Sequence, residues 1–447
     1  MNKILFWSLS VALAGFLFGF DVVVISGADK TLQALWNTSD VFHGFVVMAS
    51  ALWGTVIGAM TGGIPTKKYG GKRMLIAIGV LYFASAVGSA LANDPYTFAF
   101  FRFIGGLGIG ASTIAAPGYI SEISPAEKRG RLVAMYQLSI VIGILIAFLS
   151  NYLLKNIGED SWRWMIGVAV FPSLIYVIAV SFIPNSPRWL VVKGRITEAE
   201  KILKMTDAKA DVNSLVAETA TDNDSKAESI FMMKYRPAFL LAFFIAFFNQ
   251  FSGINAFLYY APRIFEEAGI GSNSAFLSSV GIGCINLFFT LVGMSLIDRF
   301  GRKQLMYIGS LGYIISLALV ACAFFFGWKG MSVPVFLFAF IASHAIGQGT
   351  VIWVFIAEIF PTHLRAQGQA FGSSVHWVLA AAIPSLIPYL FSTVGAAVVF
   401  SSFAIMMVWQ LLWVKFKMPE TKGISLEEVS RKLTQRSEPE IDSIIIK

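Results

Sequence analysis

Two charged side chains lie deep within long apolar segments of this sequence: Asp21 in the segment 5–28 and Arg102 in the segment 96–120. Asp21 follows the start of its segment by about sixteen residues, and Arg102 follows the start of its own by about six. The two segments run in opposite directions, so at about 1.5 Å per residue the side chains lie ~24 Å from one face and ~9 Å from the other face of a ~30 Å apolar layer. They can therefore pair. One interpretation is a static ion pair that orients two helices; the other is a proton switch, in which burial favours protonated Asp21 and a nearby guanidinium favours the charged form.

The composition requires lipid as the solvent for most of the chain. Of its 447 residues, 56% are apolar and 13% are charged, against roughly 45–50% and about 25% in soluble domains. Twelve segments are long and apolar enough to cross a membrane as helices. They cover residues 5–28, 42–64, 74–92, 96–120, 131–154, 163–183, 237–265, 275–297, 304–327, 333–358, 368–391 and 394–416. Their continuous apolar character disfavours a β-barrel, whose strands alternate.

The basic residues predict the orientation. If both termini are cytoplasmic, 28 of the 34 Lys and Arg fall on the cytoplasmic side, five fall outside, and Arg102 lies within a segment. This bias follows the positive-inside rule and explains the net charge without a nucleic-acid partner. The short outer loops, such as 29–41, favour the inner (plasma) membrane of a bacterial cell.

Two motifs recur at nearly the same distance along the chain. Glu122-Ile-Ser-Pro125 recurs as Glu358-Ile-Phe-Pro361 at an offset of 236, and Lys68-Tyr-Gly70 recurs as Arg299-Phe-Gly301 at an offset of 231. An even number of spans returns each copy to the same side, which predicts an all-α protein of two pseudo-symmetric six-helix bundles with a site between them near the bilayer midplane. The expected units are an N-terminal bundle 1–183, a cytoplasmic linker with short helices 184–236, a C-terminal bundle 237–416 and a cytoplasmic tail 417–447. In the linker, Thr197 and Glu200 form a capping-box pattern that predicts the start of an amphipathic helix.

Eight motifs follow one another along the whole chain. They are Gly70-Gly-Lys-Arg73, Arg102-Phe-Ile-Gly105 with Gly108 and Gly110, Pro117-Gly-Tyr119 with Glu122, Pro184-Asn-Ser-Pro187-Arg188-Trp189, Asn249-Gln250-Phe-Ser-Gly253, Asp298-Arg-Phe-Gly-Arg302, Trp353 to Arg365, and Pro419-Glu-Thr-Lys-Gly423. In this order and spacing they resemble the sugar porter family of the major facilitator superfamily. The resemblance implies the major facilitator fold of twelve transmembrane helices and transport by alternating access.

The resemblance also bears on Asp21 and Arg102. Proton-coupled members of the family carry Asp at the Asp21 position, whereas facilitative animal glucose carriers usually carry Asn. This implies import of a monosaccharide together with H+, which is then the coupling ion, with no other cofactor. The alternative is an uncoupled uniporter of a sugar or polyol. A sugar sensor is disfavoured by the short tail, and another solute carrier of the superfamily by the motifs.

By the resemblance, a set of polar and aromatic side chains falls on substrate positions. Gln250, Asn255, Tyr259, Asn286, Trp353 and Trp377 correspond to sugar contacts, Phe18 and Gly349 to lining residues, and Asn249 and His376 complete the set. Such groups suit a sugar, because hydroxyls need partners that donate and accept, and the apolar ring face suits an aromatic platform. For each amide, a hydrogen bond between helices remains the alternative.

Three departures from the family pattern leave the sugar open among hexoses, pentoses and polyols. Asn249 stands where the first of two glutamines is usual, and His376 stands where Gln or Asn is common. The glutamine usually found in the span corresponding to 144–148 is missing. The N-terminal bundle is therefore expected to offer fewer polar contacts.

Charged residues at the cytoplasmic helix ends form a second expected constellation. In the family, such charges bridge the two halves only while the cytoplasmic side is closed. The expected pairs are Glu122 with Arg129 or Arg131, Glu358 with Arg365, and Asp298 with Arg299 and Arg302. Ordinary surface ion pairs are the alternative.

No residue pattern predicts an enzyme or a metal site. The four histidines, at positions 43, 344, 363 and 376, do not have the spacing of metal ligands. His43 and His344 are expected to be structural or loop residues. The expected partners are a small-molecule sugar and the lipid bilayer, with no obligate protein partner.

Overall fold

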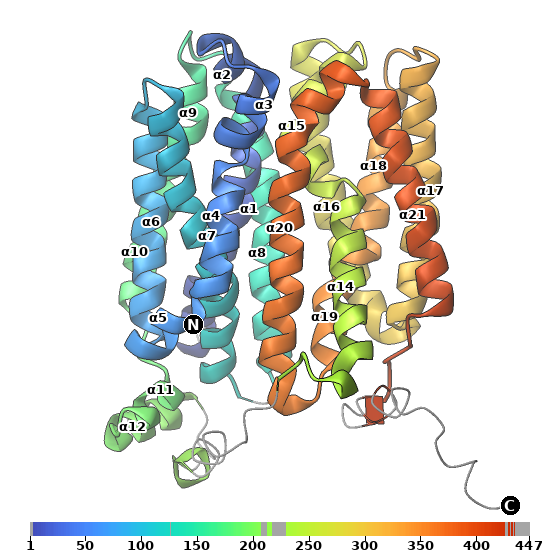
Figure 1. Cartoon of the computed structure of the whole chain (residues 1–447). Helices are drawn as coiled ribbons and strands as arrows, with labels where there is room; N and C mark the ends of the chain where they lie inside the picture. Colours follow the sequence, from blue (N-terminus) through green and yellow to red (C-terminus); the bar gives the residue numbers. More distant parts are fainter. Residues whose placement is uncertain are drawn as a thin grey trace, which may run out of the picture.

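The computed structural model describes residues 3–125, 127–206, 212–216, 229–424, 428, 429, 431 and 433. Within these residues every regular element is a helix (Figure 1). In this described part of the chain, eleven helices are long and apolar enough to cross a membrane, and the bent pair Asp40–Met48 and Ser50–Thr61, with an angle of 43°, makes a twelfth if it is one span. The predicted all-α polytopic fold is confirmed.

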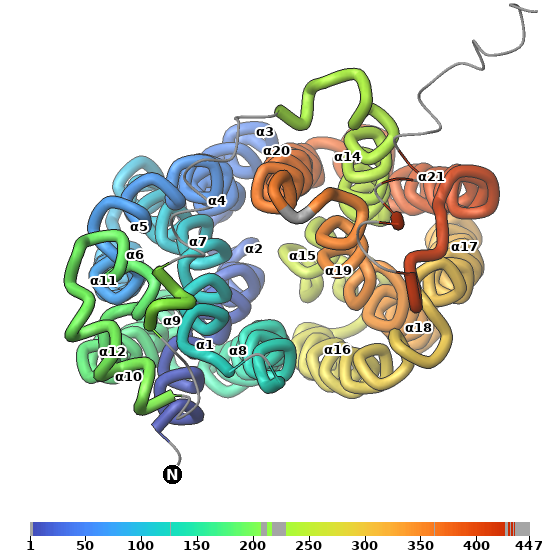
Figure 2. The backbone as a smooth tube through the Cα atoms, turned by 90° about the horizontal axis from the view of Figure 1, so that it is seen from below, coloured from blue at the N-terminus to red at the C-terminus, as the bar shows by residue number. Residues whose placement is uncertain are grey.

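The two halves of the chain form two groups of helices side by side (Figure 2). The first half contains α1 (Lys3–Val24), η1 (Ile25–Gly27), α2 (Asp29–Leu35), α3 (Asp40–Phe42), η2 (His43–Met48), α4 (Ser50–Thr61), α5 (Gly63–Tyr69), α6 (Gly71–Leu91), α7 (Pro95–Ile123), α8 (Arg129–Leu154), α9 (Ser161–Gly167) and α10 (Val170–Ser181). The second half contains η3 (Met233–Tyr235), α14 (Arg236–Phe251), α15 (Ile254–Glu267), α16 (Ser272–Phe300), α17 (Arg302–Phe325), α18 (Ser332–Ile346), α19 (Gln348–Ile359), η4 (Thr362–Leu364), α20 (Arg365–Thr393) and α21 (Ala396–Phe416). The halves meet where α8 packs against α16 and α4 packs against α20.

Between the halves, α11 (Pro187–Val192) and α12 (Ile196–Thr206) lie beyond one end of the bundle (Figure 1). We call this end the linker end and the opposite end, which carries α2 and α3, the far end. The predicted linker helix is present as α12, but it begins at Ile196, so Thr197 lies inside the helix and does not cap it. The last part of the expected tail lies outside the described residues.

Two glycines in the repeated loops have the same backbone conformation. Gly70 separates α5 from α6 with φ of 91°, and Gly301 separates α16 from α17 with φ of 88°. A side chain is strained at such a positive φ, which explains glycine at both positions. The corresponding turns support the internal repeat that the sequence predicts.

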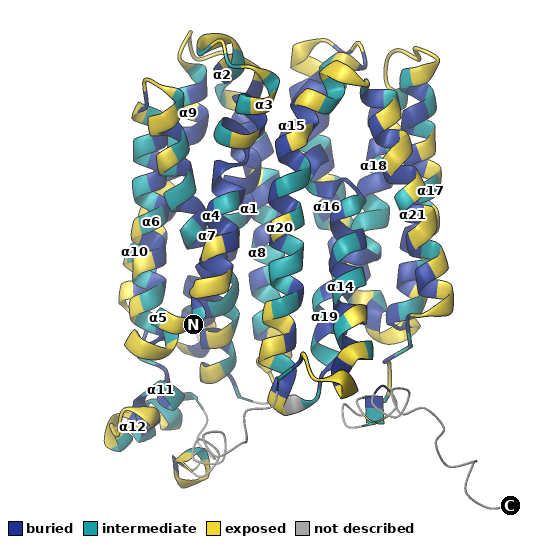
Figure 3. Ribbon diagram, viewed as in Figure 1, coloured by how far each residue is buried: buried dark blue, intermediate teal, exposed yellow. Residues whose placement is uncertain are grey.

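Exposed residues, drawn in yellow, lie along the spanning helices (Figure 3), and many of them are large and apolar. Phe171 of α10 is 69% exposed, Phe288 of α16 is 60% exposed, and Ile315 of α17 is 60% exposed. An exposed apolar surface of this extent is unfavourable in water and suits contact with lipid chains. The interior of each half is packed with apolar side chains, so the few buried polar groups described next stand out.

Candidate functional site

Asp21 of α1 and Arg102 of α7 form a buried ion pair in the first half. Nη1 of Arg102 donates to Oδ1 of Asp21 at 2.5 Å, and Nη2 donates to the main-chain carbonyl of Asp21 at 3.0 Å. The two residues are 7% and 1% exposed. The guanidinium thus holds both the carboxylate and the helix that carries it. The residue count predicts the common depth of the two side chains, and the structure brings them together.

One carboxylate oxygen of Asp21 stays outside this pairing. Oδ2 of Asp21 and Nε of Arg102 are buried and have no hydrogen-bond partner among the described residues. Gly105, one turn after Arg102, faces Asp21 and the hydroxyl of Ser85, and an added Cβ there would come within 2.4 Å of the Ser85 Oγ. A carboxylate held at one oxygen can carry a proton on the other without losing the arginine.

A break between α14 and α15 folds three amides together in the second half. Gly253 adopts the left-handed conformation, with φ of 83°, at the start of α15. This turn brings Asn255 back toward α14, where its Nδ2 donates to Oε1 of Gln250 at 2.8 Å. Nε2 of Gln250 in turn donates to Oδ1 of Asn249 at 2.9 Å. The left-handed turn at Gly253 thus joins the three amides.

His376 of α20 lies beside these amides and within a row of aromatic rings. Its Nδ1 lies 3.1 Å from Nε2 of Gln250. The rings of Trp353 and Trp377 each lie 5.0 Å from the His376 ring, measured between centroids. The Trp377 ring lies 5.4 Å from Phe18, which belongs to the first half. The aromatic row therefore crosses the boundary between the halves.

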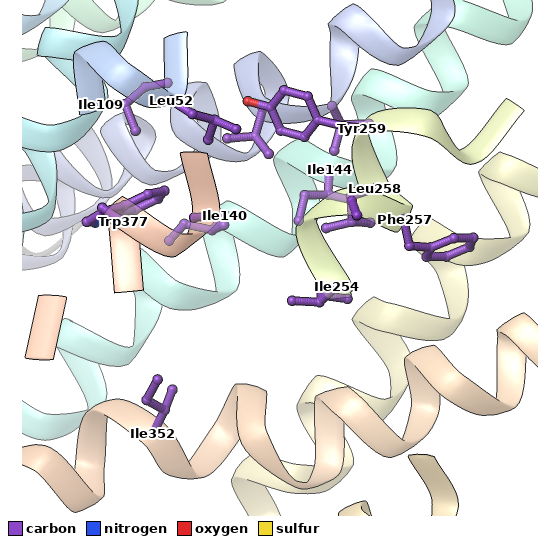
Figure 4. Close-up of a cluster of buried hydrophobic side chains, with 14 of the residues drawn as sticks. Leu52, Ile109, Ile140, Ile144, Ile254, Phe257, Leu258, Tyr259, Ile352 and Trp377 are labelled. Carbon is purple, nitrogen blue, oxygen red and sulfur yellow. The ribbon is translucent and has the colours of Figure 1, made fainter. Parts of the chain in front are cut away.

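Tyr259 and Trp377 lie in an apolar cluster formed by both halves (Figure 4). Ile140 and Ile144 of α8 contribute its first-half wall, so apolar side chains lie where the family usually has a glutamine. The Tyr259 hydroxyl and the Trp377 indole nitrogen are buried without a hydrogen-bond partner among the described residues. A buried polar group in this condition requires an explanation, such as a ligand. Tyr259 also lies within electrostatic range of Arg102 and Asp21, so the substrate positions and the ion pair are close together.

The structure does not bring Asn286 and Gly349 into this amide cluster. Oδ1 of Asn286 accepts from the hydroxyl of Thr290 at 3.5 Å, within α16. Gly349 of α19 faces His344, because an added Cβ would lie 3.3 Å from the His344 ring. In the described part of the chain, neither residue is hydrogen-bonded to the amides of α14 and α15.

Two buried glutamines extend the amide cluster and are not predicted by the sequence analysis. Gln348 of α19 and Gln410 of α21 are both 0% exposed. Oε1 of Gln348 accepts from Nδ2 of Asn249 at 3.4 Å, and its Nε2 donates to Oε1 of Gln410 at 2.9 Å. Both lie in predicted apolar spans, where a polar residue is itself a signal of hydrogen bonding between helices.

At the linker end, Glu358 pairs differently from the expectation. Its carboxylate accepts from Nη2 and Nε of Arg302, at 2.7 and 3.0 Å, and from the hydroxyl of Thr421 at 2.6 Å. Arg365 is not its partner. Asp298 lies 3.4 Å from the same Arg302, while the main-chain carbonyl of Arg299 accepts from Lys422. These contacts all lie within the second half.

The first-half counterpart also differs. Glu122 lies beside Ser186 and Arg188, which follow α10. Arg129 and Arg131 lie at the exposed start of α8 and form no ion pair with Glu122. Among the described residues, no ion pair joins the two halves at the linker end.

The far end, in contrast, carries buried charges that join the halves. Asp29 of α2 is 1% exposed, and its Oδ2 lies 2.6 Å from Nε of Arg263 in α15. Its Oδ1 lies 2.8 Å from Nε2 of His43, which is 0% exposed. Lys30 pairs with Glu266 at 2.6 Å beside them. His43, which the sequence predicts to be a structural or loop residue, belongs to this cluster between the halves, a position that is not apparent from the sequence.

Comparisons with known proteins agree with this architecture. A family model described as sugar (and other) transporter matches residues 7–433. An arabinose-proton symporter of Bacillus subtilis is 33% identical over 442 residues, which cover 96% of this chain and 95% of the relative. A glucose transporter of Staphylococcus epidermidis is 35% identical over 445 residues, with 98% of both chains covered.

A solved structure gives the same result for the fold. The xylose transporter XylE of Escherichia coli, in a partially occluded inward open conformation, matches with a TM-score of 0.84 and 30% sequence identity. The match covers 95% of this chain and 100% of that chain. The protein is therefore an integral membrane transporter and not an enzyme. The chain belongs to the sugar transporter family, as a sugar porter of the major facilitator superfamily.

Proposed function

We propose that this transporter imports a monosaccharide together with H+, using Asp21 as the proton-carrying group. The observation that carries the proposal is the half-satisfied carboxylate: Arg102 holds Oδ1, whereas Oδ2 is buried and has no hydrogen-bond partner within the described residues. Protonation at Oδ2 removes the negative charge and weakens the attraction to Arg102. Because Tyr259 lies within electrostatic range of both groups, protonation of Asp21 changes the electrostatic potential at a residue of the second half. No cofactor other than the coupling ion H+ enters the proposal.

The proposed substrate site lies between the halves. The second half supplies the amides Gln250 and Asn255 and the aromatic surface of Trp353 and Trp377, while the first half supplies Phe18 and an apolar wall. This combination suits a ring with hydroxyls on its edge and C–H groups on its face. The relatives are named for arabinose, glucose and xylose, which supports a pentose or hexose as the substrate.

We further infer that the linker end is cytoplasmic and that the structure is an inward-open form. The positive-inside bias places both termini and the linker in the cytoplasm. Within the described residues, the ion pairs between the halves all lie at the far end, at Asp29–Arg263 and Lys30–Glu266. A transporter closed outside and open inside requires this asymmetry under alternating access. The similarity to an inward open XylE structure supports the same assignment.

The test is sugar accumulation in proteoliposomes. With an imposed inward proton gradient, the wild-type protein should accumulate labelled xylose, arabinose or glucose above equilibrium, and a protonophore should abolish the accumulation. Asp21→Asn should lose the accumulation but retain exchange of labelled for unlabelled sugar, because the amide cannot release a proton. Asp160→Asn, at an exposed carboxylate, is the matched control.

Two outcomes would contradict the proposal. Wild-type uptake that reaches equilibrium and ignores the gradient would identify an uncoupled uniporter. Accumulation by Asp21→Asn at the wild-type level would keep the symport but remove Asp21 from the coupling step.

A further inference from the structure

The amide cluster is one end of a continuous hydrogen-bonded chain through the second half. Each amide donates from its nitrogen to the carbonyl oxygen of the next. The donors and acceptors, in order, are Asn255 to Gln250 at 2.8 Å, Gln250 to Asn249 at 2.9 Å, Asn249 to Gln348 at 3.4 Å, Gln348 to Gln410 at 2.9 Å, and Gln410 to the hydroxyl of Ser310 at 2.8 Å. The chain therefore runs from the substrate positions on α15 to α17 and α21.

Ser310, at one terminus of this hydrogen-bonded chain, determines which way each amide in it points. The hydroxyl of Ser310 donates its single proton to the main-chain carbonyl of Met306 at 2.7 Å. A carbonyl oxygen can only accept, so Ser310 can offer only an acceptor to Gln410. Gln410 must then present its NH2 group to Ser310 and its oxygen to Gln348, and the same constraint passes along every amide.

The other terminus of the chain is Asn255. One N–H of its NH2 group donates to Gln250, which fixes the amide with its nitrogen toward Gln250 and leaves the carbonyl oxygen Oδ1 as its one acceptor for a ligand. Asn255 is also the one partly exposed member of the chain, whereas Gln348, Gln410 and Ser310 are all 0% exposed. A buried amide with two fixed partners does not flip without leaving both unsatisfied.

We propose that Gln348 and Gln410 are positioning residues that hold Asn255 with its carbonyl oxygen toward the sugar. A sugar hydroxyl that contacts Oδ1 of Asn255 must then act as a donor, because a carbonyl oxygen can only accept. The inference rests on the proposed function, because it assumes that Asn255 contacts a sugar. Gln348 and Gln410 thereby act on the sugar contact from α19 and α21, and they fix Asn255 as the hydrogen-bond acceptor in that contact.

The test compares sugar affinity in Gln410→Met and Gln410→Glu. Gln410→Met keeps the length of the side chain but removes its hydrogen bonds to Gln348 and Ser310. The amides are then free to turn, so Asn255 can present either its oxygen or its NH2 group to the sugar. The neutral carboxylic acid in Gln410→Glu can still donate to Ser310 and accept from Gln348, so this variant should preserve the hydrogen-bonded chain of amides. Affinities are measured by competition against a labelled monosaccharide in detergent, with thermal unfolding recorded for each variant.

The diagnostic readout is a panel of monodeoxy analogues of the transported sugar. We expect Gln410→Met to bind the parent sugar about threefold to tenfold more weakly, the loss of one hydrogen bond, and Gln410→Glu to stay within about twofold of the wild type. The analogue that lacks the hydroxyl facing Asn255 should bind wild type and Gln410→Met equally, since a double-mutant cycle isolates that contact. A general structural defect would weaken every analogue by the same factor.

A second pair of variants covers the case in which Gln410→Met does not fold. Ser310→Ala removes the terminus that sets the direction. Ser316→Ala is its matched control in α17, since the Ser316 hydroxyl donates to the backbone carbonyls of Gly312 and Tyr313 in its own helix. Ser310→Ala should repeat the analogue-specific loss and Ser316→Ala should not. A wild type that binds the parent sugar, together with equal losses for all analogues or none, overturns the positioning role and leaves the proposed function standing. A wild type that binds no monosaccharide overturns both.

Discussion

At the linker end, Glu420 combines a half-buried position with four backbone donors. Its carboxylate accepts from the N–H groups of Arg302, Thr421 and Lys422, each at 2.9 Å, and of Lys303 at 3.0 Å. Burial alone raises the pKa of Glu420, but the four N–H groups favour the charged form and lower its pKa below the usual value. This carboxylate fastens the segment after α21 to the start of α17.

We predict that Glu420→Gln lowers the stability of the protein at neutral pH by about 1 kcal/mol, because the amide offers the N–H groups a weaker acceptor. A carboxylate whose pKa is lower in the folded state than in the unfolded state stabilises the fold fully at any pH above its pKa in the unfolded state. That stabilisation is lost as the pH falls through the lowered pKa. Melting curves in detergent from pH 7 to pH 3 should therefore converge for wild type and variant at acid pH.

The control is Glu159→Gln, at an exposed loop position. It should leave the melting temperature unchanged at every pH. A difference between wild type and Glu420→Gln that persisted unchanged to pH 3 would contradict the charge-based explanation.

At the level of single residues, the sequence predicts some contacts of the site and misses others. Counting residues predicts the shared depth of Asp21 and Arg102, because the rise of a helix is fixed. The same count cannot pair Gln348 with Gln410, since one polar residue in an apolar span gives no direction around the helix axis. The partner of Glu358 is also missed, because Arg302 and Arg365 begin α17 and α20, and both of these helices pack against α19.

At the scale of elements, the break between α14 and α15 carries most of the site. We predict that Gly253→Ala destabilises the protein by about 2–3 kcal/mol, from left-handed strain and overpacking. An added Cβ would come within 2.6 Å of the Phe403 ring. Because Asn255 reaches Gln250 only across this turn, sugar affinity should fall as well. Melting temperature and sugar binding in detergent measure the two effects.

Gly271→Ala is the matched control, since Gly271 precedes α16 with a negative φ and no atom within 4 Å of an added Cβ. It should change neither property. Wild-type affinity in Gly253→Ala would mean that the glycine turn does not position Asn255.

The membrane-spanning helices are predictable, because the length of an apolar segment indicates directly whether it can cross the bilayer. Their internal breaks are less so. The second span bends by 43° where η2 (His43–Met48) meets α4, and hydropathy along 42–64 gives no sign of it. The cap of α12 is misplaced by two residues. Thr197 fits the capping pattern, but the helix begins at Ile196, so Arg195 precedes it and pairs with Glu198.

At the scale of the whole molecule, the repeat predicts two similar bundles but not how they touch. Lys30 and Glu266 are 236 residues apart, the same offset that separates the two copies of the Glu-Ile-x-Pro motif at Glu122 and Glu358. Their pairing at the far end is what a pseudo-twofold axis between the halves produces, because contacts near the axis join equivalent positions. Which end closes is a property of the packed halves, and the sequence alone does not specify it.

The buried cluster of Asp29, His43 and Arg263 should therefore control which side of the transporter is open. Removing one partner of a buried ion pair costs about 3–5 kcal/mol if the other stays buried. A transporter can avoid this cost by opening the far end and exposing Asp29 to water. We predict that Arg263→Gln shifts the population at least about tenfold toward the form that is open at the far end, a change of about 1.4 kcal/mol.

The shift can be measured as a distance between the halves. Spin labels on Glu159→Cys and Ser274→Cys, both exposed at the far end, report its opening in a background with Cys284→Ser and Cys322→Ser. Lys30→Gln is the matched control: it also breaks a pair between the halves, but the Lys30 side chain is 49% exposed, so the pair contributes under about 1 kcal/mol. Arg263→Gln should lengthen the distance and Lys30→Gln should not. Identical distance distributions for both variants and the wild type would show that the buried cluster does not hold the far end closed.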